Sequence, residues 1–225
     1  MSNLSYMQKA TDRGQLQIHV TTERGFFPIK DASIRLSYTG NPTEIIEELS
    51  TDISGQTAAV ELPAPPLEYS MEPSEFQPYS EYTIQVNASG YRPINISGIS
   101  VLPDKTSIQN VRMETATVEN PLERNIVITA NTLYGNFPPK IPEDEIKPMT
   151  ESGEIVLSRV VIPEYVIVHD GPPSDSSAND YYVRYRDYIK NVASSEIYST
   201  WPDTTIRANV LAIMSFTLNR VYTEW

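Results

Sequence analysis

Short stretches in which apolar and polar residues alternate recur through the first half of this chain, and they constrain its fold more than any other feature. Gln15–Thr21 alternates in this way, and Ala32–Tyr38 and Tyr82–Ala88 do the same. A period of two places every second side chain on one face, as in a β-strand with one buried face. Further strands are expected at Thr57–Leu62, Ile94–Val101 and Ser107–Met113, so residues 15–113 are predicted to form an all-β unit.

Turn signals separate these segments. The second strand stops at Gly40-Asn-Pro42, and Gly90-Tyr-Arg-Pro93 turns the chain after the strand at 82–88. Thr51-Asp-Ile-Ser-Gly55 is a turn signal in which Gly55 can take a positive φ. The proline-rich stretch Pro63–Pro78 is expected to be a long surface loop. Several short strands with regular turns predict a sandwich or a barrel.

Residues 116–150 differ in composition from what precedes them. Prolines occur here among acidic residues, and Phe137-Pro-Pro-Lys-Ile-Pro142 favours an extended polyproline conformation. We interpret 116–150 as a linker between a β-sandwich at 1–115 and a second region at 151–225. Within the linker, Asn125–Thr129 is a stretch that could add a strand to either neighbour.

The second region begins as β and becomes helical. Glu154–Val161 and Tyr165–Val168 are expected strands, followed by a polar loop at Asp170–Asp180. After Tyr185 the period becomes that of a helix. The predicted fold class is therefore a mainly β N-terminal sandwich followed by an α+β segment with two helices.

The second of these helices has clear start signals and a strongly apolar composition. Pro202 suits its first turn, with Thr200 as the N-cap. Its apolar residues recur at three-to-four spacing, which predicts a mostly buried helix. The residues on this face are Ile206, Val210, Ile213, Thr217 and Val221.

Charge and composition exclude several function classes. The formal net charge is −12, and the few Lys and Arg residues are scattered, so no nucleic-acid partner is expected. There is no cysteine, and His19 and His169 are far apart, so neither a metal site nor a cofactor is expected. No run of 18 apolar residues predicts a membrane span, and Met1–Gly14 lacks the apolar region of a secretory signal.

The first region resembles the carboxypeptidase-regulatory-like, or transthyretin-like, β-sandwich. The resemblance rests on Gly14-x-Leu-x-Ile-x-Val20, Pro28–Ile34, Thr51-Asp-x-Ser-Gly55 and Tyr82-x-Ile-x-Val-x-Ala-x-Gly-Tyr91. Each of these matches a strand or a turn, so the resemblance implies a fold and says little about an activity.

The second region resembles the SpoIID family of peptidoglycan-cleaving domains. The matching residues are Tyr188-Ile-x-x-Val-x-x-x-Glu196, Trp201-Pro202 and Ile206-Arg-Ala-Asn209, where the family commonly has Gln at the position of Asn209. As a whole the chain is similar to SleC-type spore cortex-lytic enzymes of clostridia, a likeness also carried by Leu133–Pro142. The family domain extends beyond this helix and is followed by a peptidoglycan-binding module, so the chain is expected to be the N-terminal part of a longer enzyme.

The resemblance implies lytic transglycosylation of cortex peptidoglycan, with Glu196 as the catalytic acid and base. A carboxyl group that acts as an acid near neutral pH needs a raised pKa, which burial beside apolar groups provides. Ile197, Tyr198 and Trp201 are close enough in sequence to supply such a pocket. The alternative reading of Glu196 is a solvated side chain at the end of a helix.

Three further residues are candidates for substrate binding. Trp201 is placed to stack on a sugar ring or to pack in the core, and Tyr185 belongs to a tyrosine cluster that could bind glycan. Arg207 would face the peptide carboxylates of peptidoglycan or solvate its helix.

The resemblance also implies partners and a location. The expected partners are cortex peptidoglycan and a subtilisin-like germination protease that removes the N-terminal region, and the expected location is the cortex or coat region of the spore. The alternative function is a non-enzymatic anchoring or adhesion module at the spore surface. A secreted carbohydrate-binding module is a weaker third interpretation.

Overall fold

The computed structural model describes residues 12–71, 76–117, 122–131, 133, 161–172 and 174–221. Its contacts divide the chain into two units, 1–131 and 132–225, which are described separately here. Each unit has its own cluster of buried apolar side chains. The described part consists of a mainly β sandwich followed by an α+β segment with two α-helices, as the sequence predicts.

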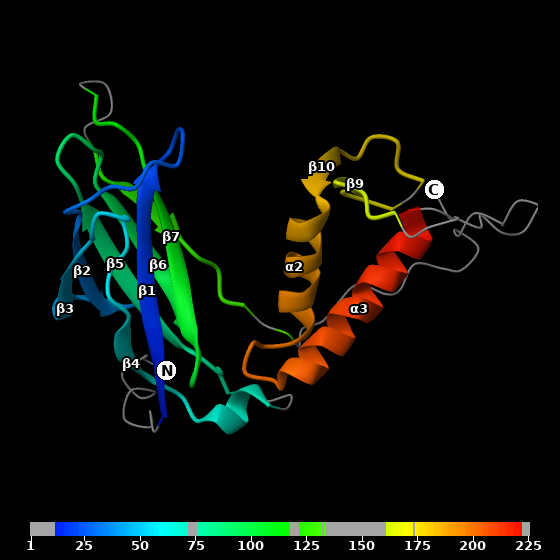
Figure 1. Ribbon diagram of the computed structural model, residues 1–225, viewed down its shortest axis with the longest axis horizontal. Coiled ribbons are helices and arrows are strands. Elements are labelled where there is room, and N and C mark those ends of the chain that lie inside the picture. Colours follow the sequence, from blue (N-terminus) through cyan, green and yellow to red (C-terminus); the bar gives the residue numbers. More distant parts are fainter. Residues whose placement is uncertain are drawn as a thin grey trace, which may run out of the picture. The chain divides into compact units, whose positions relative to one another are not determined.

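The first unit is a sandwich of two sheets (Figure 1). The smaller sheet has three strands in the order β4 (Val60–Ala64), β1 (Asp12–Thr22) and β7 (Thr106–Met113). The larger sheet has five strands in the order β3 (Asn41–Ser50), β2 (Ser33–Tyr38), β5 (Ser80–Asn87), β6 (Ile94–Val101) and β8 (Arg124–Val127). Two pairs, β1 with β7 and β6 with β8, are parallel, and the other neighbours are antiparallel.

The core lies between the sheets and follows the alternation read from the sequence. Leu16, Ile18 and Val20 of β1 are buried, whereas the residues between them are more exposed. They belong to one cluster with Ile34 and Ile84 of the larger sheet. The buried face of each strand supplies most of its stabilisation, since burying an apolar side chain contributes roughly 1.5–3 kcal/mol.

The turn at Thr51–Gly55 is confirmed. The Asp52 carboxylate Oδ1 accepts hydrogen bonds from the backbone N–H groups of Ser54 at 2.8 Å and Gln56 at 3.0 Å. Gly55 has φ of 72°, and a Cβ there would lie 2.4 Å from the carbonyl oxygen of Val20. Only glycine therefore fits this position, for conformation and for space.

Two elements of the sandwich depart from the expected pattern. The strand β3 was not predicted, because it contains Pro42 and several glutamates and most of its residues are exposed. It is an edge strand, where proline and charged side chains are tolerated. A short 3-10 helix, η1 (Leu67–Ser70), lies in the expected loop 63–78.

The strand β8 lies within the range that the sequence assigns to the linker. It pairs in parallel with β6, from Ile94 opposite Arg124 to Ser97 opposite Val127. Glu114 strengthens this attachment by accepting from Arg124 at 2.8 Å and from Arg92 at 3.1 Å. The stretch at 125–129, which could have joined either neighbour, therefore joins the first. Most of the rest of 116–150 lies outside the described residues.

The second unit contains an antiparallel strand pair and two helices. The strands are β9 (Tyr165–His169) and β10 (Asp180–Arg184), and the helices are α2 (Tyr185–Glu196) and α3 (Asp203–Asn219). The core brings together Val166, Tyr185, Ile189 and Ile213. The strand β10 was not predicted, since four of its five side chains are exposed and give no buried alternation. The expected strand at 154–161 lies almost wholly outside the described residues.

Two expectations about α3 were wrong. Its N-cap position is Pro202, and no side chain caps the helix, so Thr200 does not serve as the cap. The predicted apolar face is correct, with Ile213 and Thr217 buried, but the helix as a whole is not mostly buried. Leu211 and Phe216 are 62% and 63% exposed, because the packing of the described unit covers only one side of α3. Neither described α-helix combines the length and apolar character needed to cross a membrane.

Candidate functional site

The candidate catalytic carboxylate lies where α2 ends. Glu196 is the last residue of α2, and the chain leaves the helix at Ile197 in extended conformation. A short connection then leads to α3, which begins at Asp203. The hairpin brings Asn209 of α3 to Glu196, and the amide Nδ2 of Asn209 donates a hydrogen bond of 2.8 Å to Glu196 Oε2.

Asn209 ends one of the stretches that carry the resemblance to the SpoIID family, but its role was not predicted from the sequence. It lies thirteen residues after Glu196, and only the helical hairpin brings the two together. Its presence where the family commonly has Gln was the available signal, because both side chains end in an amide that can donate to a carboxylate.

The environment of Glu196 differs from the expected apolar pocket. Tyr198 is buried and Trp201 is half-buried, and the backbone N–H of Trp201 donates to the carbonyl of Tyr198 at 3.2 Å. Glu196 itself is exposed. The apolar residues therefore form the connection between the helices, and the described residues do not enclose the carboxylate.

The other two predicted binding residues lie apart from this carboxylate or on the surface. Tyr185 is only 5% exposed and packs in the core of the unit. It begins the helix that Glu196 ends, about 16 Å away along the axis at 1.5 Å per residue. Arg207 is exposed near the start of α3. The structure thus groups Glu196 with Asn209, next to the connection that contains Trp201, and does not bring Tyr185 to them.

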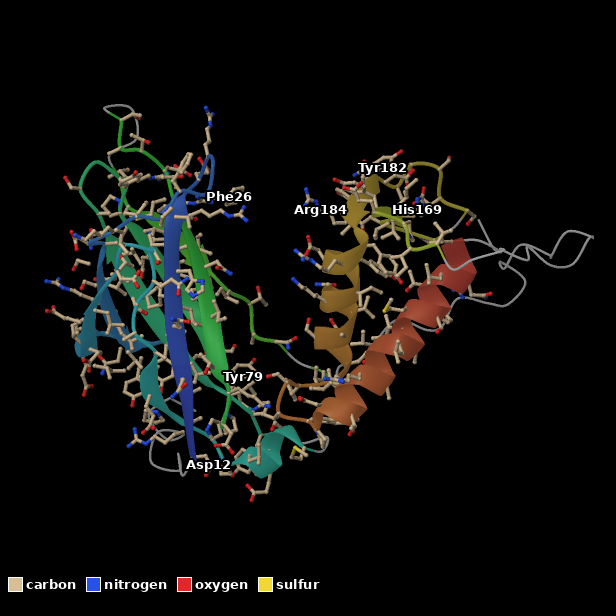
Figure 2. The ribbon with its side chains drawn as sticks, in the orientation of Figure 1. Asp12, Phe26, Tyr79, His169, Tyr182 and Arg184 are labelled. Atoms are coloured by element: carbon tan, nitrogen blue, oxygen red, sulfur yellow. The ribbon has the colours of Figure 1, made fainter. Side chains whose placement is uncertain are left out.

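A second polar constellation links β9 and β10. His169 and Asp180 are opposite each other in the strand pair, with His169 Nδ1 2.8 Å from Asp180 Oδ1. The other ring nitrogen, Nε2, lies 3.0 Å from the carbonyl oxygen of Pro172. The hydrogen bond to Asp180 is the main reason that the pKa of His169 is raised above its usual 6.5. Figure 2 labels His169 near Tyr182 and Arg184 in this part of the unit.

The sequence carries a signal for this pair. His169 precedes the expected polar loop at 170–180 and Asp180 ends it, and the two ends of a hairpin loop face each other in register. No group of three or more His, Asp or Glu side chains is arranged as metal ligands within the described ranges.

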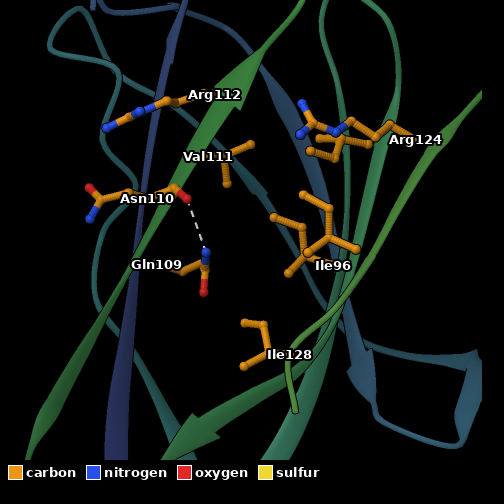
Figure 3. Close-up of a pocket in the computed structure, with 9 residues that line it drawn as sticks. Ile96, Gln109, Asn110, Val111, Arg112, Arg124 and Ile128 are labelled. Atoms are coloured by element: carbon orange, nitrogen blue, oxygen red, sulfur yellow. Dashed lines mark hydrogen bonds between the residues drawn. The ribbon is translucent and has the colours of Figure 1, made fainter. Parts of the chain in front are cut away.

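The sandwich contains a groove of about 340 Å³ between the edges of its two sheets (Figure 3). Its residues come from β6, from consecutive positions of β7, and from β8 with the residue that follows it. They are Ile94, Ile96, Gln109, Asn110, Val111, Arg112, Arg124, Ile126 and Ile128. None of these nine residues is acidic, although the chain as a whole has a net charge of −12.

No protein-family model matches the sequence, and no curated protein matches it significantly. Among solved structures, the chain is similar to the TIE protein of Bacillus anthracis, with 17% identity and a TM-score of 0.32 over 47% of this chain and 17% of that one. GBS52, the minor pilin of Streptococcus agalactiae, has 15% identity and a TM-score of 0.33 over 48% of this chain and 46% of that one. The 5-hydroxyisourate hydrolase of Klebsiella pneumoniae has 16% identity and a TM-score of 0.30 over 46% of this chain and 92% of that one.

The chain therefore spans less than half of the length of the first two of these structures. With TM-scores of 0.30 to 0.33, these likenesses carry no argument about function.

Proposed function

We propose that this chain is part of a lytic transglycosylase that cleaves spore cortex peptidoglycan during germination, with Glu196 as its acid–base residue. The observation that supports the proposal is the hydrogen bond from Asn209 to Glu196. It joins two parts of the stretch that resembles the SpoIID family, the end of Tyr188–Glu196 and the end of Ile206–Asn209.

The reaction needs one carboxyl group that works twice. Glu196 would first protonate the glycosidic oxygen between muramic acid and glucosamine, so that the glycosidic bond breaks. Its carboxylate would then take the proton of the C6 hydroxyl, which attacks the anomeric carbon of the same muramic acid and forms the anhydro product. No water is consumed, so no second carboxylate is needed to hold one, unlike in hydrolases with paired carboxylates.

The hydrogen bond from Asn209 would orient the Glu196 carboxyl group for this role. Asn209 binds Oε2, and within the described part of the chain Oε1 has no hydrogen-bond partner. The amide fixes the orientation of the carboxyl group without adding a formal charge, and Oε1 remains accessible to substrate. A general acid also needs water to be excluded around it. Because Glu196 is exposed, the proposal requires a bound glycan strand to provide that cover.

Two neighbouring side chains would contribute to glycan binding in this proposal. Trp201 lies in the connection that follows Glu196 and is half-buried, so part of its surface remains available for stacking on a sugar ring. Arg207 is exposed on α3 and would pair with peptide carboxylates of the substrate. Tyr185 is left out because it is buried in the core.

The sandwich would then be the N-terminal region that a subtilisin-like germination protease removes. Cleavage is expected in the part of 116–150 that follows β8, because β8 itself is paired within the sandwich. The location that accompanies this proposal is the cortex or coat region of the spore.

The test is Glu196→Gln in the enzyme that contains this chain. Glutamine keeps the size of the side chain and a carbonyl oxygen that can accept from Asn209, but it cannot transfer the proton. Release of anhydromuramic fragments from decoated spores, measured by mass spectrometry, should fall at least about a hundredfold. Glu164→Gln changes another exposed glutamate of the same unit and should release fragments at the wild-type rate.

Circular dichroism of each variant serves as the control for folding. The site lies elsewhere if Glu196→Gln keeps more than about a tenth of the release while Glu164→Gln abolishes it. If the wild-type enzyme binds spores and releases no fragments, the non-enzymatic anchoring or adhesion function replaces this proposal.

A further inference from the structure

The two sheets of the sandwich differ in size, and the difference leaves one edge open. The smaller sheet ends at β7, and no described strand pairs with the outer edge of β7. The larger sheet continues past that position through β6 to β8. The groove of Figure 3 lies where these two edges meet, and four consecutive residues of β7 line it.

The open edge of β7 presents unused backbone hydrogen-bonding groups. The bonds from Gln15 N–H to Lys105 C=O at 2.8 Å and from Glu23 N–H to Met113 C=O at 3.0 Å set the phase of the parallel ladder. Odd-numbered residues of β7 therefore bond to β1, and even-numbered residues direct both backbone groups outward. The outward set includes Ile108, Asn110 and Arg112.

One of these outward groups already has a local partner. The side-chain amide Nε2 of Gln109 donates to the carbonyl oxygen of Asn110 at 3.0 Å, as the dashed line in Figure 3 marks. This bond involves adjacent residues on the surface, so an incoming backbone N–H can replace it at little cost.

The floor of the groove is apolar and fits the side chains of an added strand. Ile94 and Ile96 are buried, whereas Ile126 and Ile128 are half-buried at the margin of the core. A strand placed about 4.8 Å from β7 would continue the smaller sheet and lie over these isoleucines. Every second side chain of that strand would point onto them, so an apolar residue at alternate positions is required.

The charge of the groove selects the remaining side chains of the occupant. Arg112 and Arg124 are the charged residues of the lining. Glu114 binds both Arg124 and Arg92, so this trio keeps a net charge of +1. The Arg112 side chain leaves β7 on the outer face of the smaller sheet, away from the isoleucines (Figure 3), and stacks on the Phe26 ring at 4.5 Å. It has no carboxylate partner among the described residues and would face the outward side chains of an added strand. The groove and the sheet face beside it are therefore cationic in an anionic chain and complement an acidic occupant.

We propose that this groove binds an extended acidic segment of a partner protein, which adds as a strand to the outer edge of β7. Backbone bonds to Ile108, Asn110 and Arg112 provide affinity, and alternate apolar side chains on the isoleucine floor provide specificity. A second copy of this chain is a poorer occupant, because pairing two β7 edges would bring two cationic linings together. The inference does not depend on Glu196 or on peptidoglycan cleavage.

The probes are two blocked peptides that are tested separately. The first has three Val-Thr repeats followed by two aspartates, and the second has the same residues in reverse order. One of the two peptides is expected to bind the full chain saturably in a fluorescence-anisotropy titration. In that complex, amide hydrogen exchange at Ile108, Asn110 and Arg112 should slow at least tenfold. Exchange at Gln109 and Val111, which already bond to β1, should change little.

Backbone pairing has its own control in the peptide. In one peptide the backbone N–H groups of the odd-numbered residues are methylated, and in a second peptide those of the even-numbered residues. One of these peptides should bind at least tenfold more weakly and the other less than twofold more weakly, because only one set of N–H groups faces β7. Equal effects of the two methylated peptides would overturn strand addition.

Charge reversal in the protein tests the cationic lining. Arg112→Glu and Arg124→Glu should each weaken binding at least tenfold. Arg112 is the cleaner variant, since Arg124 also bonds to Glu114. Arg35→Glu is the matched control, because Arg35 is exposed on β2, is paired with Glu48 and does not line the groove.

Two other outcomes would overturn the inference. One is the absence of saturable binding by either peptide. The other is slowed exchange of the same three amides in the free protein as its own concentration rises, because a second copy would then be the occupant.

Discussion

At the scale of single residues, His169 is held by acceptors at both ring nitrogens. Asp180 lies at Nδ1 and the Pro172 carbonyl at Nε2, with distances of 2.8 and 3.0 Å. A neutral imidazole has one donor nitrogen, so only the imidazolium form satisfies both contacts. The pKa of His169 is accordingly raised, and the hydrogen bond to Asp180 is the largest cause. The pKa of the nearby Asp175 carboxyl is lowered, chiefly by hydrogen bonds from Ser177.

This arrangement predicts a pH dependence with a definite sign. The imidazolium of His169 stabilises the folded state, and because its pKa is raised by folding, this stabilisation is complete below the unfolded pKa of 6.5. It is lost as the pH rises through the pKa of the folded state. The loop between β9 and β10 should therefore loosen as the pH increases past that point. An NMR titration of the His169 ring should give a midpoint above 6.5 in the wild type, and Asp180→Asn should lower that midpoint. The same midpoint in both proteins would show that Asp180 is not the cause.

At the scale of elements, the two sheets of the sandwich are joined by a buried tyrosine. Tyr82 of β5 is fully buried, and its hydroxyl donates to the carbonyl oxygen of Pro63 in β4 at 2.7 Å. The ring stacks on Tyr38 with centroids 5.2 Å apart. Burial raises the pKa of the Tyr82 phenol, so the donor remains protonated and the link between the sheets persists into alkaline solution.

Removing this hydroxyl should weaken the sandwich without disturbing its packing. Tyr82→Phe keeps the ring and loses the hydrogen bond to Pro63, which should lower the free energy of unfolding by about 1 kcal/mol. Urea denaturation measures this loss. Tyr91→Phe is the matched control, because the Tyr91 hydroxyl makes no hydrogen bond within the described part of the chain, and it should shift the midpoint much less.

At the scale of the whole molecule, the described part of the chain has two cores with no residue in common. The sandwich core is built from strand residues, and the core of the second unit combines both helices with β9 and β10. The domain division expected from the sequence, with a linker at 116–150, leads to the same expectation of separable units.

Calorimetry should therefore resolve two unfolding transitions. Gly55→Ala forces a side chain into a positive-φ position that lacks space, which should cost roughly 1–3 kcal/mol in the sandwich alone. The transition of the second unit should keep its temperature. A single transition that moves as a whole in Gly55→Ala would show that the units unfold together.

Sequence reasoning succeeded where an element buries one face and its apolar residues recur there at regular spacing. The strand at 15–21 was predictable because its apolar residues are the buried ones, whereas β3 and β10 expose most of their side chains and give no such pattern. The apolar face of α3 was predictable, but its coverage was not, since coverage depends on which other elements pack against it.

The candidate site was predictable only in part. Glu196 and Trp201 were selected through a family resemblance, and the structure places the second in the connection just after the first. Asn209 as a partner required knowledge of how α2 and α3 pair. Tyr185 was selected as a glycan-binding candidate but is buried in the core, because sequence alone does not show which side of a helix faces the core.

The pairing of β1 with β7 has a consequence for how the sandwich folds. Gln15 and Thr106 face each other across the ladder and are 91 residues apart in the chain. Contacts this distant in sequence slow folding, since a long loop must close before they form. During synthesis, the first strand must wait for almost the whole unit to leave the ribosome before it can be covered on its β7 side. Local hairpins such as β5–β6 should form first, and the docking of β1 should limit the rate.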